Sequence, residues 1–375
     1  MLEQSTLDGC LLSCFLFLVL YICSIRRKEQ LLSSNVSVWI HVLILLFCAF
    51  AFWNTDYYHY QETLGQIDTH YSYSDQYTHI EELYLWIYDI CGMHYTLFRI
   101  IVWGIAYLFF VLAAKKIGIY NNLTFSLFII LFLLTFSYAR VSLGMATFFY
   151  ACTLLSDKQN RLLKIIIGML CCTLAFFSHK SMVALLCLLP FSFIKYNRWI
   201  WLLVMAMVLM VVHYYSDYIT TLLFGTVDTM DEASDLYDTF ASASTYNDAN
   251  LDRKVGIGEL LQNILQYASI FVPLIMLLGK NGYSCLQNTM QYRILYNVAI
   301  LIAIVGLSMG VLVSFNSPLC YRYLYMAYIP IVLLISLLFQ KKLISTTQLG
   351  IIIILGSASV WYRLLYVVYN ASVNL

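Results

Sequence analysis

Apolar runs of about 20 residues recur along the whole of this chain, and a run of that length can cross a bilayer as an α-helix. Only 11% of the residues are charged and 62% are hydrophobic, whereas a soluble domain carries roughly 25% charged residues. The sequence therefore predicts an all-α, polytopic integral membrane protein, with one membrane domain over 1–375 and about twelve transmembrane helices. The predicted spans lie near 9–25, 36–53, 97–114, 123–139, 141–156, 163–178, 181–195, 199–215, 258–279, 294–313, 321–340 and 347–368.

The lysines and arginines gather at alternate ends of these runs, which predicts the side that each loop faces. Fourteen of the 21 cations lie at one set of ends, and 18 of the 20 acidic residues lie on the opposite side, the exceptions being Glu29 and Asp157. The cation-rich side is predicted to be cytoplasmic, because positive loops are retained there. Segments 54–96 and 216–257, both long, are then predicted to be extracytoplasmic. The fourteen cations are Arg26, Arg27, Lys28, Lys115, Lys116, Lys158, Arg161, Lys164, Lys195, Arg198, Lys280, Arg293, Lys341 and Lys342.

A few cations lie on the outer side, where membrane insertion does not favour them. Arg140, in FSYARVSLG, is the sole charged residue of the stretch 117–156. Lys180, beside His179 in FFSHKSM, and Arg322, in CYRYLYM, lie at two further outer turns. Ionisable groups at membrane depth usually line a cavity or meet an anion, and the arginine fork matches a phosphate with two hydrogen bonds. The alternative for a single arginine is that it snorkels to the interface. The full outer set is Arg99, Arg140, Lys180, Arg253, Lys254, Arg322 and Arg363.

The order and spacing of these motifs resemble the EpsG family of Wzy-type bacterial polysaccharide polymerases. FSYARVSLGMATFFY (136–150) and FFSHKSM (176–182) resemble the family's arginine-led span and its F-H-K-S-A-like turn. NTDYYHY (54–60) and EELY (81–84) resemble its Asp-Tyr-rich outer segment and the acidic-aromatic stretch that follows. CYRYLYM (320–326) resembles its C-terminal arginine-containing segment. The resemblance covers most of the chain by order and spacing.

This resemblance implies a glycosyltransferase on the outer face of a bacterial inner membrane. A hydroxyl of one lipid-linked repeat unit attacks the growing chain on undecaprenyl pyrophosphate, and the lipid pyrophosphate leaves. Fixed cations stabilise charge that develops on a leaving group, so the candidate pyrophosphate ligands are Arg140, Lys180 and Arg322. The product expected is an exopolysaccharide, a capsule or an O-antigen, and no cofactor is implied.

The attacking hydroxyl needs a general base within hydrogen-bond reach. Asp56, Glu82 and His179 are the candidates, and the sequence alone does not rank them. The outer tyrosines offer aromatic faces that stack on sugars, and Tyr57, Tyr58 and Tyr60 are the candidate sugar-binding residues. No metal-binding motif is present, and the acidic run 228–238 is interpreted as a solvated helix face. Cysteines within the apolar runs are interpreted as small packing residues.

The implied substrate is an undecaprenyl-pyrophosphate-linked oligosaccharide, with membrane lipid around the chain and no nucleic-acid partner. A chain-length regulator and a flippase are the implied protein partners. Two other functions stay open. A lipid-linked oligosaccharide flippase would show two related halves and mostly short loops, whereas this chain has two long outer segments. An O-antigen ligase would use the same donor with a different acceptor.

Overall fold

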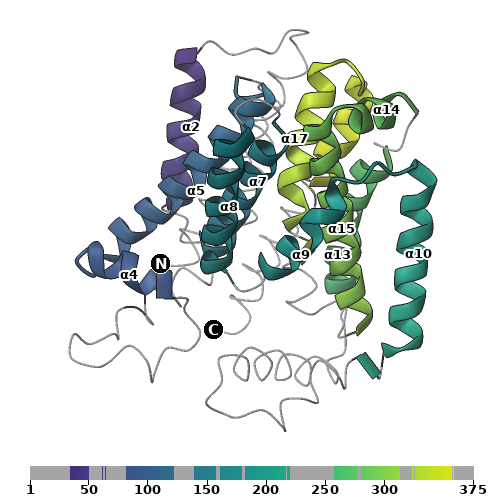
Figure 1. The fold of residues 1–375 in the computed structure, drawn as a ribbon, viewed down its shortest axis with the longest axis horizontal. Coiled ribbons are helices and arrows are strands. Elements are labelled where there is room, and N and C mark those ends of the chain that lie inside the picture. Colours follow the sequence, from purple (N-terminus) through teal and green to yellow (C-terminus); the bar gives the residue numbers. More distant parts are fainter. Residues whose placement is uncertain are drawn as a thin grey trace.

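The structure, a computed structural model, describes residues 34–49, 61, 64, 82–121, 139–157, 161–179, 182–216, 218–219, 257–276, 280–312, 323–324, 326–356 and 358. Within these residues every regular element is a helix (Figure 1). The helices are α2 (Ser34–Ala49), α4 (Glu82–Ile90), α5 (Tyr95–Ile117), α7 (Ala139–Leu155), α8 (Arg161–Ser178), α9 (Met182–Ser192), α10 (Arg198–Tyr214), α13 (Ile257–Met276), α14 (Lys280–Asn288), α15 (Met290–Leu312) and α17 (Tyr328–Gln340), followed by Thr346–Gly356.

Ten of the predicted spans overlap a helix, whereas 9–25 and, apart from Ala139, 123–139 lie outside the described residues. Three helices are long and apolar enough to cross a membrane, namely α5, α8 and α15. Several shorter helices are also apolar, and α17 begins at Tyr328, later than the predicted start at 321.

Two short helices fall where the sequence predicted only loops. α4 lies within the first long outer segment, and α14 lies within the cation-bearing connection between α13 and α15. They occupy opposite ends of the fold (Figure 1), which agrees with their predicted placement on opposite sides of the membrane.

Small residues bring α7 and α8 into close antiparallel contact. A Cβ on Gly168 of α8 would lie 3.0 Å from the Leu155 side chain, and one on Gly144 of α7 would lie 3.4 Å from the Ala175 carbonyl oxygen. Helices in membranes associate through such small residues, because they let the backbones approach. Cys152, Cys171 and Cys172 are buried with free thiols, so these cysteines pack as the sequence predicted. Cys187 of α9, predicted to pack in the same way, is exposed.

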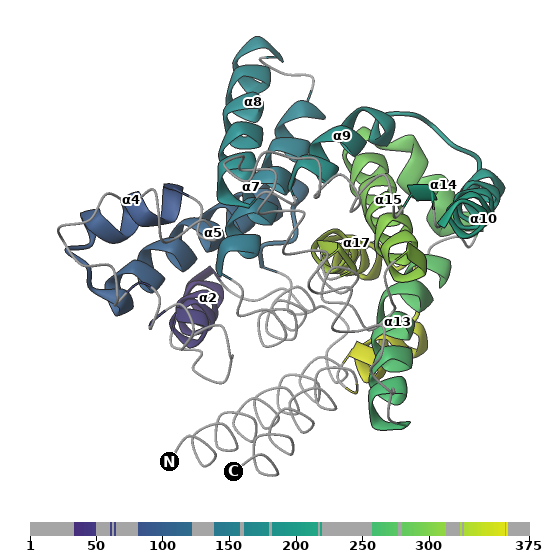
Figure 2. The same cartoon turned by 90° about the horizontal axis from the view of Figure 1, so that it is seen from below.

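α17 is the most enclosed of the described helices. Every residue from Ile329 to Leu338 is buried, and an apolar helix that is buried all round lies inside a bundle. α17 packs against α15 and α13, and Figure 2 shows it end-on with α7 and α15 on either side. The buried amide of Asn297 in α15 donates to the carbonyl oxygens of Ser192 and Ile194, at 2.8 and 2.9 Å, which joins α15 to the end of α9.

The outward faces of several helices are apolar as well. On α8 the exposed residues include Leu162, Met169 and Leu170, and on α10 they include Trp199 and Met210. Contiguous apolar surface of this extent is rare on soluble monomers and marks contact with a partner or with lipid. These faces fit helices that lie against a bilayer.

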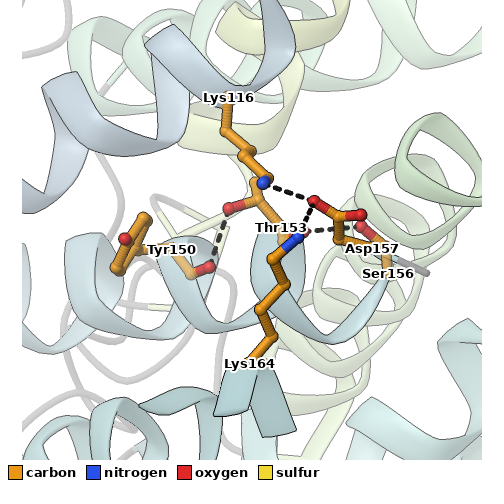
Figure 3. A network of polar contacts seen from close by, with 6 residues as sticks. All are labelled: Lys116, Tyr150, Thr153, Ser156, Asp157 and Lys164. Carbon is orange, nitrogen blue, oxygen red and sulfur yellow. Dashed lines mark hydrogen bonds and ion pairs between the residues drawn. The ribbon is translucent and has the colours of Figure 1, made fainter. Parts of the chain in front are cut away.

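The predicted cytoplasmic ends of α5, α7 and α8 are joined by an ion-pair network (Figure 3). The Asp157 carboxylate, just beyond α7, pairs with Lys116 near the end of α5 and with Lys164 in α8, the latter at 2.6 Å. The hydroxyls of Thr153 and Ser156 each donate to a backbone carbonyl oxygen three residues earlier. Asp157, one of the two acids on the cation-rich side, thus lies among three helix ends.

Candidate functional site

The described parts of the motifs 136–150 and 176–182 come together at the predicted outer end of α7, α8 and α9. A Cβ on Gly144 would lie 2.9 Å from Cγ of Met182, the first residue of α9, and 3.4 Å from the Ala175 oxygen in the last turn of α8. Arg140 is the second residue of α7, one turn before Gly144. His179 follows α8 directly, one turn after Ala175. The backbone segments carrying Arg140 and His179 therefore lie at the same end of the three helices.

His179 directly follows α8, and α9 begins at Met182. Its backbone N–H donates to the Ala175 oxygen at 3.3 Å, and its carbonyl oxygen accepts from the N–H of Met182 at 2.9 Å. The residue is buried, with 9% of its surface exposed. These two backbone bonds tie His179 to the last turn of α8 and to the first residue of α9.

Glu82 lies in a different environment. It is exposed and occupies the first turn of α4. A negative charge at this position is stabilised by the positive end of the helix dipole. α4 packs against both α5 and α8 through its other face. That face carries Tyr84 and Tyr88, whose rings make edge contacts with Phe98 of α5. These aromatic contacts anchor α4 to α5, with Glu82 at the exposed start of α4.

Arg99 is one of the predicted outer cations but was not among the predicted site residues. Arg99 lies on the second turn of α5 and is 3% exposed. Its Nη1 donates to the Tyr95 hydroxyl at 3.5 Å, and its guanidinium carbon is 5.9 Å from the centroid of the Tyr95 ring. A buried cation at the outer end of a span is a functional candidate on the same grounds as Arg140. In the sequence, only its position on the outer side could have indicated a functional role.

Most of the other predicted site residues fall outside the described part of the chain. These are Asp56, Tyr57, Tyr58, Tyr60, Lys180 and Arg322, together with the side chain of Arg140. Leu324, two residues after Arg322, lies against the outer half of α15, because a Cβ on Gly306 would meet its Cγ at 2.7 Å. α15 in turn packs against α7. Within the described residues no group of three or more His, Cys, Asp or Glu side chains could hold a metal ion.

The described residues form helices, several of them apolar and with apolar outward faces, and this is the architecture of a multi-pass membrane protein. Comparison with known families then identifies it further: the EpsG family matches residues 35–374, and the chain belongs to that family. This membership associates the protein with exopolysaccharide synthesis. No curated protein and no solved structure matches the chain.

The contact at Gly144 gives a test of the packing that joins the two motifs. Gly144→Val is expected to lower the free energy of unfolding by about 1–3 kcal/mol, because the added side chain overpacks the contact with Met182 and Ala175. Gly104→Val in α5 is the matched control, since nothing lies within 4 Å of a Cβ there. The measurement is the thermal unfolding midpoint of both variants in detergent. Equal midpoints for the two variants would contradict the close α7–α8–α9 contact.

Proposed function

We propose that this EpsG-family chain polymerises lipid-linked oligosaccharide repeat units into an exopolysaccharide, a capsule or an O-antigen. The growing chain is transferred from undecaprenyl pyrophosphate to an incoming repeat unit on the outer face of a bacterial cytoplasmic membrane. The observation that carries the proposal is the meeting of the Arg140 and His179 segments beside Gly144, Ala175 and Met182. A cation and a proton acceptor at one place are what a transfer with an anionic leaving group needs.

The roles proposed for the site residues follow from the charge that develops during transfer. As the glycosidic bond to the pyrophosphate breaks, negative charge grows on phosphate oxygens, and Arg140, Lys180 and Arg322 bind those oxygens. Cations fixed in a low-dielectric site stabilise such charge more than water does, because they need no reorganisation. Asp56, Glu82 or His179 accepts the proton of the attacking hydroxyl. Tyr57, Tyr58 and Tyr60 bind the sugars by stacking.

The proposal requires about twelve spans, with segments 54–96 and 216–257 outside the cytoplasm. Single cysteines in place of Ser72 and Ser242, in a background without other cysteines, are expected to react with a membrane-impermeant maleimide on intact spheroplasts. A cysteine in place of Gln159, in the predicted inner loop after Asp157, is the control and should react only after lysis. Labelling of Gln159→Cys in intact cells, with none at the other two sites, would reverse the topology and remove the proposed outer active face.

Deletion of the gene and gel analysis of the surface glycan separate the three candidate functions. Loss of a polymerase leaves single repeat units that are still exported, because the flippase and the ligase remain. Loss of a flippase leaves no repeat units outside. Loss of a ligase leaves polymer that stays on the lipid carrier. A ladder of normal length in the deletion strain would reject the polymerase assignment. The chain-length regulator and the flippase are the expected functional partners.

A further inference from the structure

A polar cavity opens at the cation-bearing end of the fold, away from the motif segments. Its volume is about 570 Å³, within the range of about 300–1,000 Å³ that ligand pockets occupy. One wall comes from the ends of α5 and α7, with Lys116 and Asp157. The other wall comes from the junction of α14 and α15, with Asn288, Gln291 and Arg293. The cavity thus lies between the N-terminal and the C-terminal helices of the chain.

The charge around this cavity is positive. Lys116 and Arg293 line it, and Lys164 lies behind Asp157 at 2.6 Å, so three cations accompany a single carboxylate. Asp157 is already held by both lysines. An incoming anion therefore meets a carboxylate whose charge is largely compensated.

Arg293 has unused hydrogen-bonding capacity within the described residues. Its Nη1 makes one long bond, 3.5 Å, to the Gln287 carbonyl oxygen, and its Nε is buried with no hydrogen-bond partner. Among the described residues no carboxylate lies within ion-pair distance of this guanidinium. A guanidinium offers five N–H donors, so those that face the cavity remain free to bind an anion.

The start of α15 adds a second favourable feature. α15 begins at Met290 and runs for 23 residues, so the N–H groups of its first turn and the positive end of its dipole lie at the cavity wall. Thr289, just before it, and Gln291, in its first turn, line the cavity and add polar side chains. An arginine, a lysine and a helix N-terminus on one cavity define a site for an oxyanion.

We propose that this cavity is a cytoplasmic binding site for a phosphate group. Lys116 and Arg293 hold the phosphate oxygens, and Asn288, Thr289 and Gln291 bind the group attached to the phosphate. The phosphate belongs to an anionic headgroup of the inner leaflet or to a soluble phosphate compound. The site is separate from the proposed pyrophosphate site, because the 17 residues of α7 put about 25 Å between its two ends. A ligand here joins the N-terminal and C-terminal helices and so stabilises the assembled fold.

The test uses the purified full-length protein with two probes, phosphatidylglycerol and sn-glycerol 3-phosphate, and phosphatidylcholine as the neutral comparison. Titration of each probe is followed by native mass spectrometry and by the thermal unfolding midpoint. Wild-type protein is expected to bind at least one phosphate probe and to unfold at a higher temperature when it is bound. Binding of phosphatidylglycerol alone identifies a lipid ligand, and binding of sn-glycerol 3-phosphate identifies a soluble one.

Arg293→Gln is expected to weaken the binding about tenfold, since a hydrogen-bonded charge on the phosphate is lost. Lys341→Gln is the matched control, because Lys341 is a cation at the same end, placed over the Tyr292 ring and outside the cavity lining. Its binding should equal that of wild type. No binding of either phosphate probe, or equal binding by Arg293→Gln and Lys341→Gln, overturns the proposal.

A second pair of variants tests the phosphate site if Arg293→Gln does not fold. Gln291→Glu puts a carboxylate on the cavity wall and is expected to weaken phosphate binding about tenfold by repulsion. Gln348→Glu adds the same charge elsewhere at this end, and a carboxylate there can still accept the Ser345 N–H as the amide does at 2.9 Å. Wild-type affinity in both variants would reject the site.

Discussion

Replacing Asp56 by asparagine is expected to abolish polymer formation while the protein still folds and binds the lipid-linked donor. Asparagine keeps the shape of the side chain but cannot accept the proton of the attacking hydroxyl at neutral pH. A general base contributes about 100-fold or more to a transfer of this kind. The measurement is polymer made in isolated membranes from lipid-linked repeat units, normalised to protein level by immunoblot. Retention of the donor is measured separately with labelled lipid.

The other two candidate bases supply the comparison for Asp56. His179→Gln is expected to have the milder effect, because the buried imidazole then acts by orienting groups at the turn between α8 and α9. Glu82→Gln is expected to leave most activity, since Glu82 is exposed on the first turn of α4. If Asp56→Asn keeps full activity and either His179→Gln or Glu82→Gln loses it, the general base is the residue whose substitution removes activity.

The helices long and apolar enough to cross a membrane could be predicted from the sequence, because each is a long apolar run. α5, α8 and α15 all satisfy the length and hydropathy that a bilayer demands, and they lie within a few residues of the predicted spans. α4 and α14 could not be predicted in the same way. Each has only nine residues, too few to cross a bilayer, so neither forms the long apolar run by which a span is recognised. Their stability comes from packing, such as the contact of Tyr84 and Tyr88 with Phe98.

The pairing of the helices depends on distances that a linear sequence does not contain. The glycines of α7 and α8 are visible as letters, but only the structure shows that Gly144 lies against Met182 and Ala175. For the same reason the sequence pointed to Arg140 and His179 separately, from their charge and place in the chain. Arg99 was visible as an outer cation, while its burial beside Tyr95 follows from the packing of α5. The cavity at Arg293 depends equally on tertiary contacts, because its walls lie more than a hundred residues apart in the chain.

Replacing Arg140 by alanine is expected to lower transfer by about 100-fold or more, the loss seen when a preorganised donor to a developing charge is removed. Arg140→Lys keeps the charge but loses the planar fork, so it should impair transfer to a smaller extent. Arg161 provides the control, because it is an exposed arginine in the first turn of the neighbouring helix α8, at the predicted cytoplasmic end. Arg161→Ala and Arg161→Lys should retain wild-type transfer.

The double variant tests whether Arg140 and Arg322 bind the same pyrophosphate. Residues that share one ligand are coupled, so Arg140→Ala with Arg322→Ala should cost less than the sum of the two single losses in free energy. Polymer formed in membranes is again normalised to protein level, and donor retention is measured in parallel. Additive losses would assign the two arginines to separate anions. Wild-type transfer in both Arg140→Ala and Arg140→Lys, at equal expression, would show that Arg140 only snorkels to the interface, and the catalytic assignment of the α7–α8–α9 end would fall with it.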